Sequence, residues 1–287
     1  MNRNLRHLTA CSVFVLGSGL LCAAPVVNVP TDQASITAAL GVVDPGGEIV
    51  VDASAYATES NEVTINKNVT IRAINGKTTI QAASAFLGAV HIESGASDVT
   101  LENLIVTNSD YHGVFVEVGT TLTLNNCNVD GSGNAGPHSG LWVADIGAGT
   151  FTLNATDTTF NSNFHRGWTL DFDGNYILNL DGCQINGNGE LGILIGAAGT
   201  LTMDFVDTTV DGNGATAPNN SNGALILKGS GTFVNCSFSM VWIFHDVIRY
   251  DDDFGLGNVV ASVFPTDAAS VGTSANGRIS RSSPCSM

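Results

Sequence analysis

The sequence predicts an all-β fold, a parallel β-helix of about seven coils with a short capping helix at its N-terminal end. Two observations support this prediction. Glycine is frequent (33 of 287 residues) and charged residues make up only 13% of the chain, which is typical of many short strands joined by tight turns. In addition, one short unit recurs along the middle of the chain: a small residue, then an apolar, a variable and a second apolar residue.

The recurring unit sets the period of the predicted solenoid. Its small residue recurs at intervals of 24, 27, 27, 25 and 32 residues, at Ala89, Gly113, Gly140, Gly167, Gly192 and Ala224. Periods of about 20 to 50 residues indicate stacked repeats, and a period in this range with only strands fits one coil of a β-helix. Each coil carries two further short strands, such as 99–101 and 104–106, with a corner of two residues between them.

A helical pattern precedes the first strands. Apolar residues at 36, 39, 40 and 43 share one helical face, residues 31–34 offer N-caps, and Pro45-Gly46-Gly47 ends the helix. Strands are expected at 48–51, 63–65 and 69–71. An ordinary helix before an antiparallel β-domain is the alternative, and the regular period favours the β-helix.

The two ends of the chain are predicted to lie outside this fold. Residues 1–24 are expected to be an export signal, because basic residues precede a short apolar run and Cys22-Ala23-Ala24. Lipidation of Cys22 is the alternative. Residues 25–245 form the predicted β-helix with its cap, and residues 246–287 a weakly ordered tail. No later run is apolar enough to span a membrane. We therefore expect a secreted monomer, extracellular or periplasmic.

Three cysteines occupy the same position in the repeat. Cys127, Cys183 and Cys236 stand at the first inward position of the third strand, and threonines hold this position in the coils between them. Coils stack ~4.8 Å apart, so cysteines two coils apart lie ~10 Å from each other. This exceeds the ~7 Å limit on the Cα separation of a disulfide. We therefore expect reduced, buried cysteines.

The net charge of −16, from 26 acidic and 10 basic residues, restricts the partners. It argues against nucleic-acid binding, for which a basic stripe is expected. It also disfavours direct binding of an acidic polymer, because like charges repel, so an acidic polysaccharide would need bridging cations.

The cap at 36–51, the Asn-rich turns and the recurring Gly-apolar-x-apolar unit resemble the right-handed parallel β-helix superfamily, over roughly residues 31–240. This superfamily includes pectate lyases, polygalacturonases, pectin methylesterases and alginate-type lyases, together with non-catalytic adhesins and phage tailspikes. The resemblance implies the fold but not one activity. His138-Ser139-Gly140 and His165-Arg166-Gly167 match the Gly-His-Gly turn of polygalacturonases only in part. Pectate lyases use an arginine base beside calcium-binding aspartates, and Arg166 is the one arginine or lysine between Lys77 and Lys228.

The resemblance also implies that a polymer would lie along the recurring unit. Alternation places two rows of side chains on its outer face. The first row is His91, Phe115, Trp142, Thr169, Leu194 and Ile226, and the second is Glu93, Glu117, Ala144, Asp171, Gly196 and Lys228. The catalytic candidates are Asp171, Asp173, His165, Arg166 and Glu117. The candidates for substrate binding are Trp142, Phe115, His138 and Glu93.

Each group of candidates has a chemical reason and an alternative. Asp171 and Asp173 have Cα atoms ~7 Å apart, which suits the carboxyl pair of a glycosidase. The alternative is that the acidic groups are solvated surface charges. Phe115 and Trp142 on adjacent coils would form a flat platform for sugar rings, unless the long turn covers them. His138 and His165 would form either a shared site or a ladder of stacked rings on the surface. Arg166 would either hold a carboxylate of the substrate or form a simple ion pair with the aspartates.

These observations predict a secreted protein that recognises a polysaccharide or cell-surface glycan along one face of the solenoid. Whether it also cleaves the polymer, as a polysaccharide lyase or glycoside hydrolase, stays open. A non-catalytic, adhesin-like structural module is the alternative function. The sequence assigns no metal ligand among the site residues. Ca²⁺ stays open as a cofactor, because the run Asp251-Asp252-Asp253 offers oxygen ligands of the kind that Ca²⁺ binds.

Overall fold

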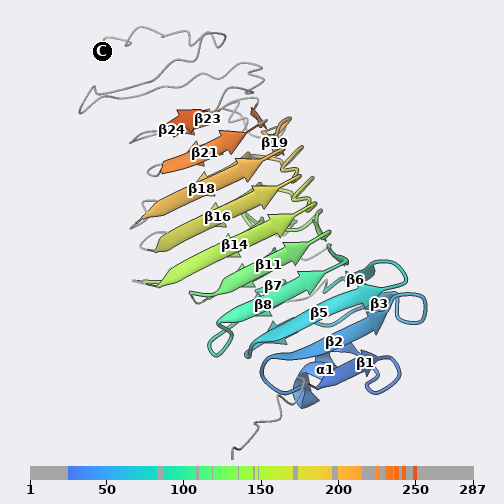
Figure 1. Ribbon diagram of the computed structural model, residues 1–287. Coiled ribbons are helices and arrows are strands. Elements are labelled where there is room, and N and C mark those ends of the chain that lie inside the picture. Colours follow the sequence, from blue (N-terminus) through green and yellow to red (C-terminus); the bar gives the residue numbers. More distant parts are fainter. Residues whose placement is uncertain are drawn as a thin grey trace, which may run out of the picture.

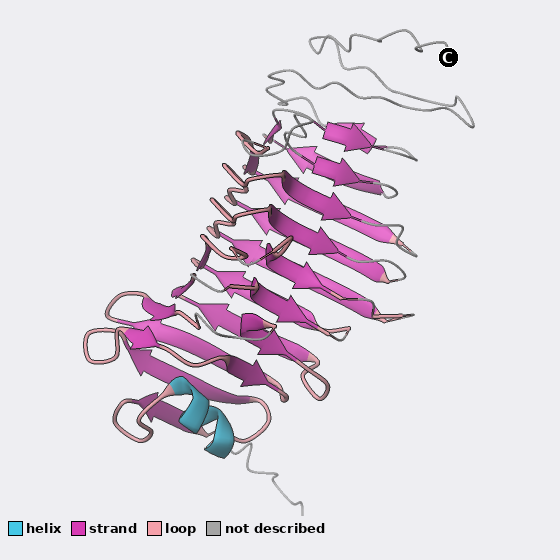
Figure 2. Cartoon of the chain, turned by 180° about the vertical axis from the view of Figure 1, so that it is seen from behind, coloured by secondary structure: helices cyan, strands magenta, loops and turns pink. Residues whose placement is uncertain are grey.

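The computed structural model describes a parallel β-solenoid of about seven coils, which confirms the predicted fold class (Figures 1 and 2). The described residues are 25–82, 87–107, 110–117, 119–134, 136–144, 146–147, 149–170, 174–195, 200–214, 224–226, 230–234, 236–238, 241–243 and 248–250. The predicted export signal at 1–24 lies outside them.

Each coil passes in turn through three walls of parallel strands. The first wall is an eight-stranded sheet of β4 (Val63–Ile65), β7 (Gly88–Ile92), β10 (His112–Val116), β13 (Ser139–Val143), β15 (Arg166–Leu170), β17 (Leu191–Ile195), β20 (Ala224–Ile226) and β23 (Val241–Ile243). The second wall is a ten-stranded sheet of β1 (Val26–Val29), β2 (Gly47–Asp52), β5 (Val69–Ile74), β8 (Asp98–Glu102), β11 (Thr121–Asn125), β14 (Thr150–Thr156), β16 (Asn175–Asp181), β18 (Leu201–Val206), β21 (Ser230–Val234) and β24 (Ile248–Tyr250).

The third wall has shorter strands. It consists of β3 (Thr58–Glu59), β6 (Thr78–Ile80), β9 (Leu104–Val106), β12 (Asn128–Val129), β19 (Thr209–Val210) and β22 (Ser237–Phe238). Isolated bridges through Thr159 and Gln184 connect β12 to β19, so the wall continues where the strands are too short to be assigned.

The core follows the predicted alternation. In β10, for example, Val114 and Val116 are fully buried and Phe115 between them points outward and is half-buried. The same order recurs in β13 and β17, because successive side chains of a strand point to opposite faces. The apolar side chains of all three walls therefore fill one continuous core.

The corner between the second and third walls requires a left-handed backbone. In five coils this position is held, with φ between 48° and 61°, by Asn75, Asn103, Asn126, Asp157 and Asp207. Gly182 takes this position in one further coil, with a φ of 63°. Glycine, asparagine and aspartate tolerate this region best, which explains why they stand at the two-residue corners.

The small residue of the recurring unit is a steric requirement of stacking. A Cβ on Gly113 would lie 2.6 Å from the carbonyl oxygen of Gly140, and a Cβ on Gly140 would lie 2.9 Å from that of Gly167. The backbone of the next coil therefore occupies the space of a side chain.

A buried asparagine ladder supports the long turn before the first wall. Asn163, Asn188 and Asn213 stand one coil apart and are at most 2% exposed. The backbone N–H of Asn163 donates to Oδ1 of Asn188 (2.9 Å), and that of Asn188 donates to Oδ1 of Asn213 (2.9 Å). The side-chain amide of Asn188 also donates to the Phe160 carbonyl oxygen at 3.0 Å. The ladder therefore satisfies polar backbone groups that the turn would otherwise bury without partners.

The N-terminal end differs from the prediction in two details. The helix α1 (Ile36–Val42) is capped by the side chain of Ser35, which accepts a hydrogen bond from the Ala38 N–H, and not by residues 31–34. A strand, β1, precedes the helix and pairs with β2. The helix covers the open end of the stack beside β1 and β2 (Figure 2). Its buried residues, Ile36 among them, close the core there.

The register of the last recurring unit is one residue away from the predicted one. The repeat pattern in the sequence places Ala224 opposite Gly192, whereas in the structure β20 pairs Ala224 with Ile193. Farther on, β23 continues the first wall and pairs with β20. The predicted end of the solenoid at residue 245 stays a prediction; β24 lies just beyond it and pairs with β21.

The cysteine prediction is confirmed for the three core residues. Cys127, Cys183 and Cys236 are free and at most 1% exposed. Their thiols lie within 3.2–3.4 Å of carbonyl oxygens of the preceding coil. Burial raises the pKa of Cys127 and of Cys183 to about 11, so both remain protonated at neutral pH.

Candidate functional site

The outer face of the eight-stranded sheet carries the predicted first row in the expected register. Phe115 pairs with His91 on one side and with Trp142 on the other, and Trp142 pairs with Thr169. Phe115 and Trp142 are half-buried, whereas His91 and Thr169 are 6% and 2% exposed. The row is therefore neither an open platform nor a fully covered one. Phe115 and Trp142 are partly accessible, and His91 and Thr169 on either side of them are buried.

Five rings from two consecutive coils, those of β10 and β13, meet on this face. The centroid of His112 lies 4.5 Å from that of Trp142, 4.7 Å from that of His138 and 5.4 Å from that of Phe115. Tyr111 lies 4.7 Å from His138. We call Tyr111, His112, Phe115, His138 and Trp142 the aromatic cluster. Three of its members, Phe115, His138 and Trp142, were predicted site residues, and the structure brings them together around His112.

His112 stands at the centre of the cluster and was not among the predicted site residues. It is 6% exposed, and its Nδ1 accepts a hydrogen bond from the Ser139 N–H at 3.1 Å. Burial, followed by the charge of His138, lowers the pKa of His112 to about 3. The imidazole is therefore neutral at physiological pH, with its proton on Nε2. The sequence places His112 directly before the recurring unit at Gly113, and the structure makes it the first residue of β10, beside the aromatic row.

His138 is a less buried imidazole in the same cluster. Its pKa is lowered, first by burial and then by the charge of His165. Its buried Nδ1 atom has no hydrogen-bond partner among the described residues. The ring contacts of His138 go to Tyr111 and His112, and the ladder of His138 and His165 stays a prediction.

The next coil contributes a charged group. Nδ1 of His165 lies 3.0 Å from Oε1 of Glu190, and Nε of Arg166 donates to Oε2 of Glu190 at 3.1 Å. All three side chains are between a fifth and a third exposed. Arg166 is therefore in an ion pair, as the simpler interpretation had it, but with Glu190 from the following coil.

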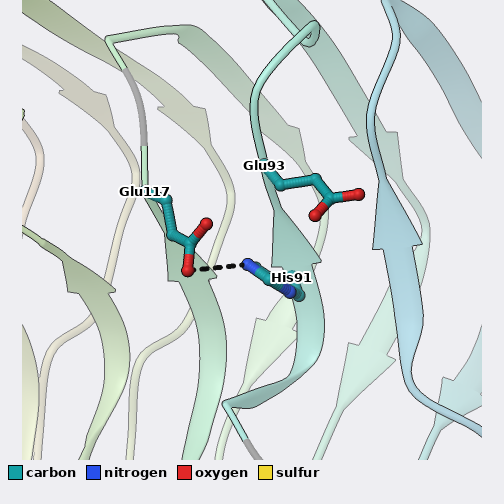
Figure 3. Close-up of side chains that lie close together, drawn as sticks. All are labelled: His91, Glu93 and Glu117. Atoms are coloured by element: carbon teal, nitrogen blue, oxygen red, sulfur yellow. Dashed lines mark ion pairs between the residues drawn. The ribbon is translucent and has the colours of Figure 1, made fainter.

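Two predicted acidic residues lie on the other side of the aromatic cluster. Glu93 follows β7 and Glu117 follows β10, and both carboxylates lie near His91 (Figure 3). Nε2 of His91 lies 3.4 Å from Oε1 of Glu117, and Nδ1 lies 3.3 Å from Oε1 of Glu62. His91 and Glu62 were not among the predicted site residues.

The predicted carboxyl pair, Asp171 and Asp173, lies outside the described residues, and so does the run 251–253 that was considered for calcium. Their roles stay predictions. A shallow hollow of about 360 Å³ lies at the corner between β5 and β6, away from the eight-stranded sheet. Of the two cations that line it, Arg72 is in an ion pair with Glu48, and Lys77 donates a hydrogen bond to the side-chain oxygen of Asn128.

Comparison with known proteins supports the fold. No family model and no curated protein sequence matches the chain. Among solved structures, the crystal structure of pectate lyase Pel9A superposes with a TM-score of 0.57 over 86% of this chain and 79% of that chain, at 14% sequence identity. This chain has the pectate lyase-like β-helix fold. Because the identity is so low, the pectate lyase-like likeness concerns the fold alone.

Within this pectate lyase-like β-helix, the described residues contain no helix with the length and apolar character that crossing a bilayer requires. The candidate site is the outer face of the eight-stranded sheet. The aromatic cluster lies on the coils of β10 and β13, and the His165–Arg166–Glu190 group follows on the next coils. The His91–Glu93–Glu117 group lies on the coils of β7 and β10, so it shares the β10 coil with the cluster.

Proposed function

We propose that this protein recognises a polysaccharide along the outer face of the eight-stranded sheet. The observation that carries the proposal is the aromatic cluster, in which five rings from two successive coils are joined by ring contacts with centroid distances of 4.5–5.4 Å. Rings that are partly exposed combine an apolar surface with polar edges, and the apolar face of a sugar ring packs on such a surface. Nε2–H of His112 supplies a neutral hydrogen-bond donor at the same place.

The charges of the site favour a neutral polymer or one bound through cations. Arg166 is already paired with Glu190, and the net charge of the chain is −16. A uronic-acid polymer would therefore meet repulsion rather than a free basic residue. We infer a neutral glycan as the first candidate substrate, on a polysaccharide or on a cell surface.

The likeness in fold supports a polysaccharide as the ligand, because the similar solved structure is a pectate lyase by its title, although it does not favour a neutral polymer. The amino-terminal pattern supports an exported protein, extracellular or periplasmic after removal of residues 1–24. We propose that the exported chain acts as a monomer.

Cleavage is a second candidate function, favoured by the contact between His165 and Glu190. A carboxylate that accepts the Nδ1–H of a histidine holds the lone pair on Nε2, which is the arrangement of a general base. His165 would act as the base of a lyase, or Asp171, Asp173 and Glu117 as the carboxyl groups of a hydrolase. If no polymer is cleaved, the remaining functions are glycan binding and an adhesin-like structural module.

Binding is tested by affinity electrophoresis in gels that contain neutral and acidic polysaccharides. We expect retardation in at least one neutral polymer, and Trp142→Ala should weaken it about tenfold, since one lost aromatic contact costs about 1.5 kcal/mol. Ile177→Ala is the control, because Ile177 is exposed on the ten-stranded sheet and should migrate like the unmodified protein. Equal migration of all three proteins with and without every polymer would leave only the structural role.

Cleavage is tested with the same polymers by measuring unsaturated ends for a lyase and reducing ends for a hydrolase, with and without Ca²⁺. Products that disappear in His165→Ala but persist in Asp171→Ala would indicate the lyase. The reverse pattern would indicate the hydrolase. Retained binding without products from any polymer would exclude both activities for that panel.

A further inference from the structure

We propose that His91, Glu93 and Glu117 form a binding site for a divalent transition-metal ion, with Zn²⁺ as the reference ligand. The site lies on the same wall as the aromatic cluster but does not include it. The proposal is therefore independent of whether the protein binds a glycan.

The fold places the three side chains side by side (Figure 3). His91 and Glu93 are two residues apart along one strand direction, so they share a face. Glu117 stands one coil away, where its N–H continues the ladder by donating to the Ile92 carbonyl oxygen at 3.0 Å. One ligand atom of each residue lies within 4.8 Å of the other two. Three donors from two coils thus converge on one point.

A buried imidazole nitrogen points into this group without a hydrogen bond. His91 is 6% exposed, and its buried Nε2 atom has no hydrogen-bond partner among the described residues. Glu117 Oε1, 3.4 Å away, is within ion-pair distance of Nε2 but outside hydrogen-bond geometry. Buried polar atoms without partners are rare in native structures, and an ion is one of the groups that satisfy them.

Glu62 orients the histidine from behind. Its Oε1 lies 3.3 Å from Nδ1 of His91, on the side opposite Glu117. When Nδ1 carries the proton of the ring, this carboxylate is placed on its side and the lone pair of Nε2 faces Glu117. A carboxylate behind a histidine is the usual support of a metal-bound imidazole.

The charges around His91 also favour a cation. Glu62, Glu93 and Glu117 supply three carboxylates, and the ion pairs recorded for Glu62 and Glu117 both go to His91. Three carboxylates therefore face a single imidazole, and a divalent ion would neutralise two of them. Because the Glu117 side chain is 42% exposed, the site is open to solvent for ion entry and for a water ligand.

The donor set selects the kind of metal. One imidazole nitrogen with two carboxylates suits Zn²⁺ or Mn²⁺, whereas Ca²⁺ takes six to eight oxygen ligands. With metal–ligand distances of about 2.1 Å, neighbouring ligands of a tetrahedral Zn²⁺ site lie ~3.4 Å apart. The separation of His91 Nε2 from Glu117 Oε1 is 3.4 Å, so this edge is already formed. Glu93 has to approach by a change of side-chain rotamer.

The test is isothermal titration calorimetry of the metal-free full chain, without a purification tag, against ZnCl₂, MnCl₂ and CaCl₂. We expect one equivalent of Zn²⁺ and Ca²⁺ binding at least about tenfold weaker. Glu117→Gln, at an exposed position that should not disturb folding, is expected to weaken Zn²⁺ binding at least about tenfold, and so is Glu93→Gln. Glu62→Gln should weaken binding about tenfold and leave the stoichiometry unchanged.

Glu102→Gln is the matched control, because Glu102 is a half-buried glutamate on the ten-stranded sheet and outside the group. Circular dichroism checks that each variant is folded. The absence of saturable Zn²⁺ binding would overturn the proposal. Zn²⁺ binding that is unchanged in Glu117→Gln, or that is weaker than Ca²⁺ binding, would overturn it as well.

Discussion

Replacing Gly167 by alanine is expected to destabilise the solenoid, although alanine is a smaller change than any other substitution. A Cβ at this position would lie 2.5 Å from the Gly192 carbonyl oxygen and 2.6 Å from Cγ2 of Ile185. The first contact is with the backbone of the next coil, which hydrogen bonds of the sheet hold in place. The added methyl group therefore forces two coils apart or distorts the turn between them.

The expected magnitude follows from two opposing effects. Overpacking in a close-packed core costs about 1–3 kcal/mol, and contact with backbone places Gly167→Ala near the upper end. Alanine also reduces the freedom of the unfolded chain, which returns about 0.4–1 kcal/mol. The net loss in the free energy of unfolding is about 2 kcal/mol. With a urea m-value of about 2.5 kcal/mol/M, the midpoint should fall by about 0.8 M.

Gly41 provides a control of opposite sign. It lies in α1, is exposed, and a Cβ there would have no atom within 4 Å. Since alanine is the better helix former, Gly41→Ala should raise the stability by up to about 1 kcal/mol. Urea unfolding is followed by far-UV circular dichroism and by tryptophan fluorescence, to which the buried Trp168 contributes. A midpoint for Gly167→Ala at or above that of the unmodified protein, with equal m-values, would refute the steric explanation of the repeat.

Three further predictions concern buried polar groups. Asn188→Ala should lower the free energy of unfolding in urea by about 3 kcal/mol, because it removes the hydrogen-bond partners of buried groups. Asn179→Ala on the outer face should lower it by less than about 1 kcal/mol. Equal losses in the two variants would contradict this prediction. Unfolded histidine binds its proton near pH 6.5 and folded His112 only near pH 3, so stability should fall as the pH drops below 6.5, by about 2 kcal/mol at pH 5. His112→Gln should flatten this part of the stability–pH curve, and an unchanged slope would rule His112 out as its source. Cys127 and Cys183 should resist a thiol reagent at neutral pH until urea unfolds the chain, as peptide mapping would show; rapid labelling of the folded protein would contradict their burial.

Most of the fold could be predicted because the period and the alternation are both present in the sequence. The inward positions of β10 and β13, and the equivalent cysteines, follow from counting residues. The last unit was set one residue off because Gly223 and Ala224 are both small, so either residue fits the pattern. The N-cap was misplaced for a similar reason, since several polar residues precede Ile36 and only the path of the chain after β1 selects Ser35.

The candidate site could be predicted only in part. Alternation and stacking placed Phe115 beside Trp142 and Glu93 beside Glu117. They did not predict the partners of His112, Glu190 and Glu62, because these contacts join side chains of different coils and depend on rotamers and on the path of the turns.

The sequence by itself determined the repeat, the inward and outward rows and the buried free cysteines, because these depend on a period of two along a strand and on one coil length. Only the tertiary structure decided which outward side chains touch. Contacts between coils depend on rotamers and on the path of the long turns, and these follow from packing rather than from spacing. For this reason a neutral His112 within an aromatic cluster and an unsatisfied His91 nitrogen beside two carboxylates became visible only in the folded chain.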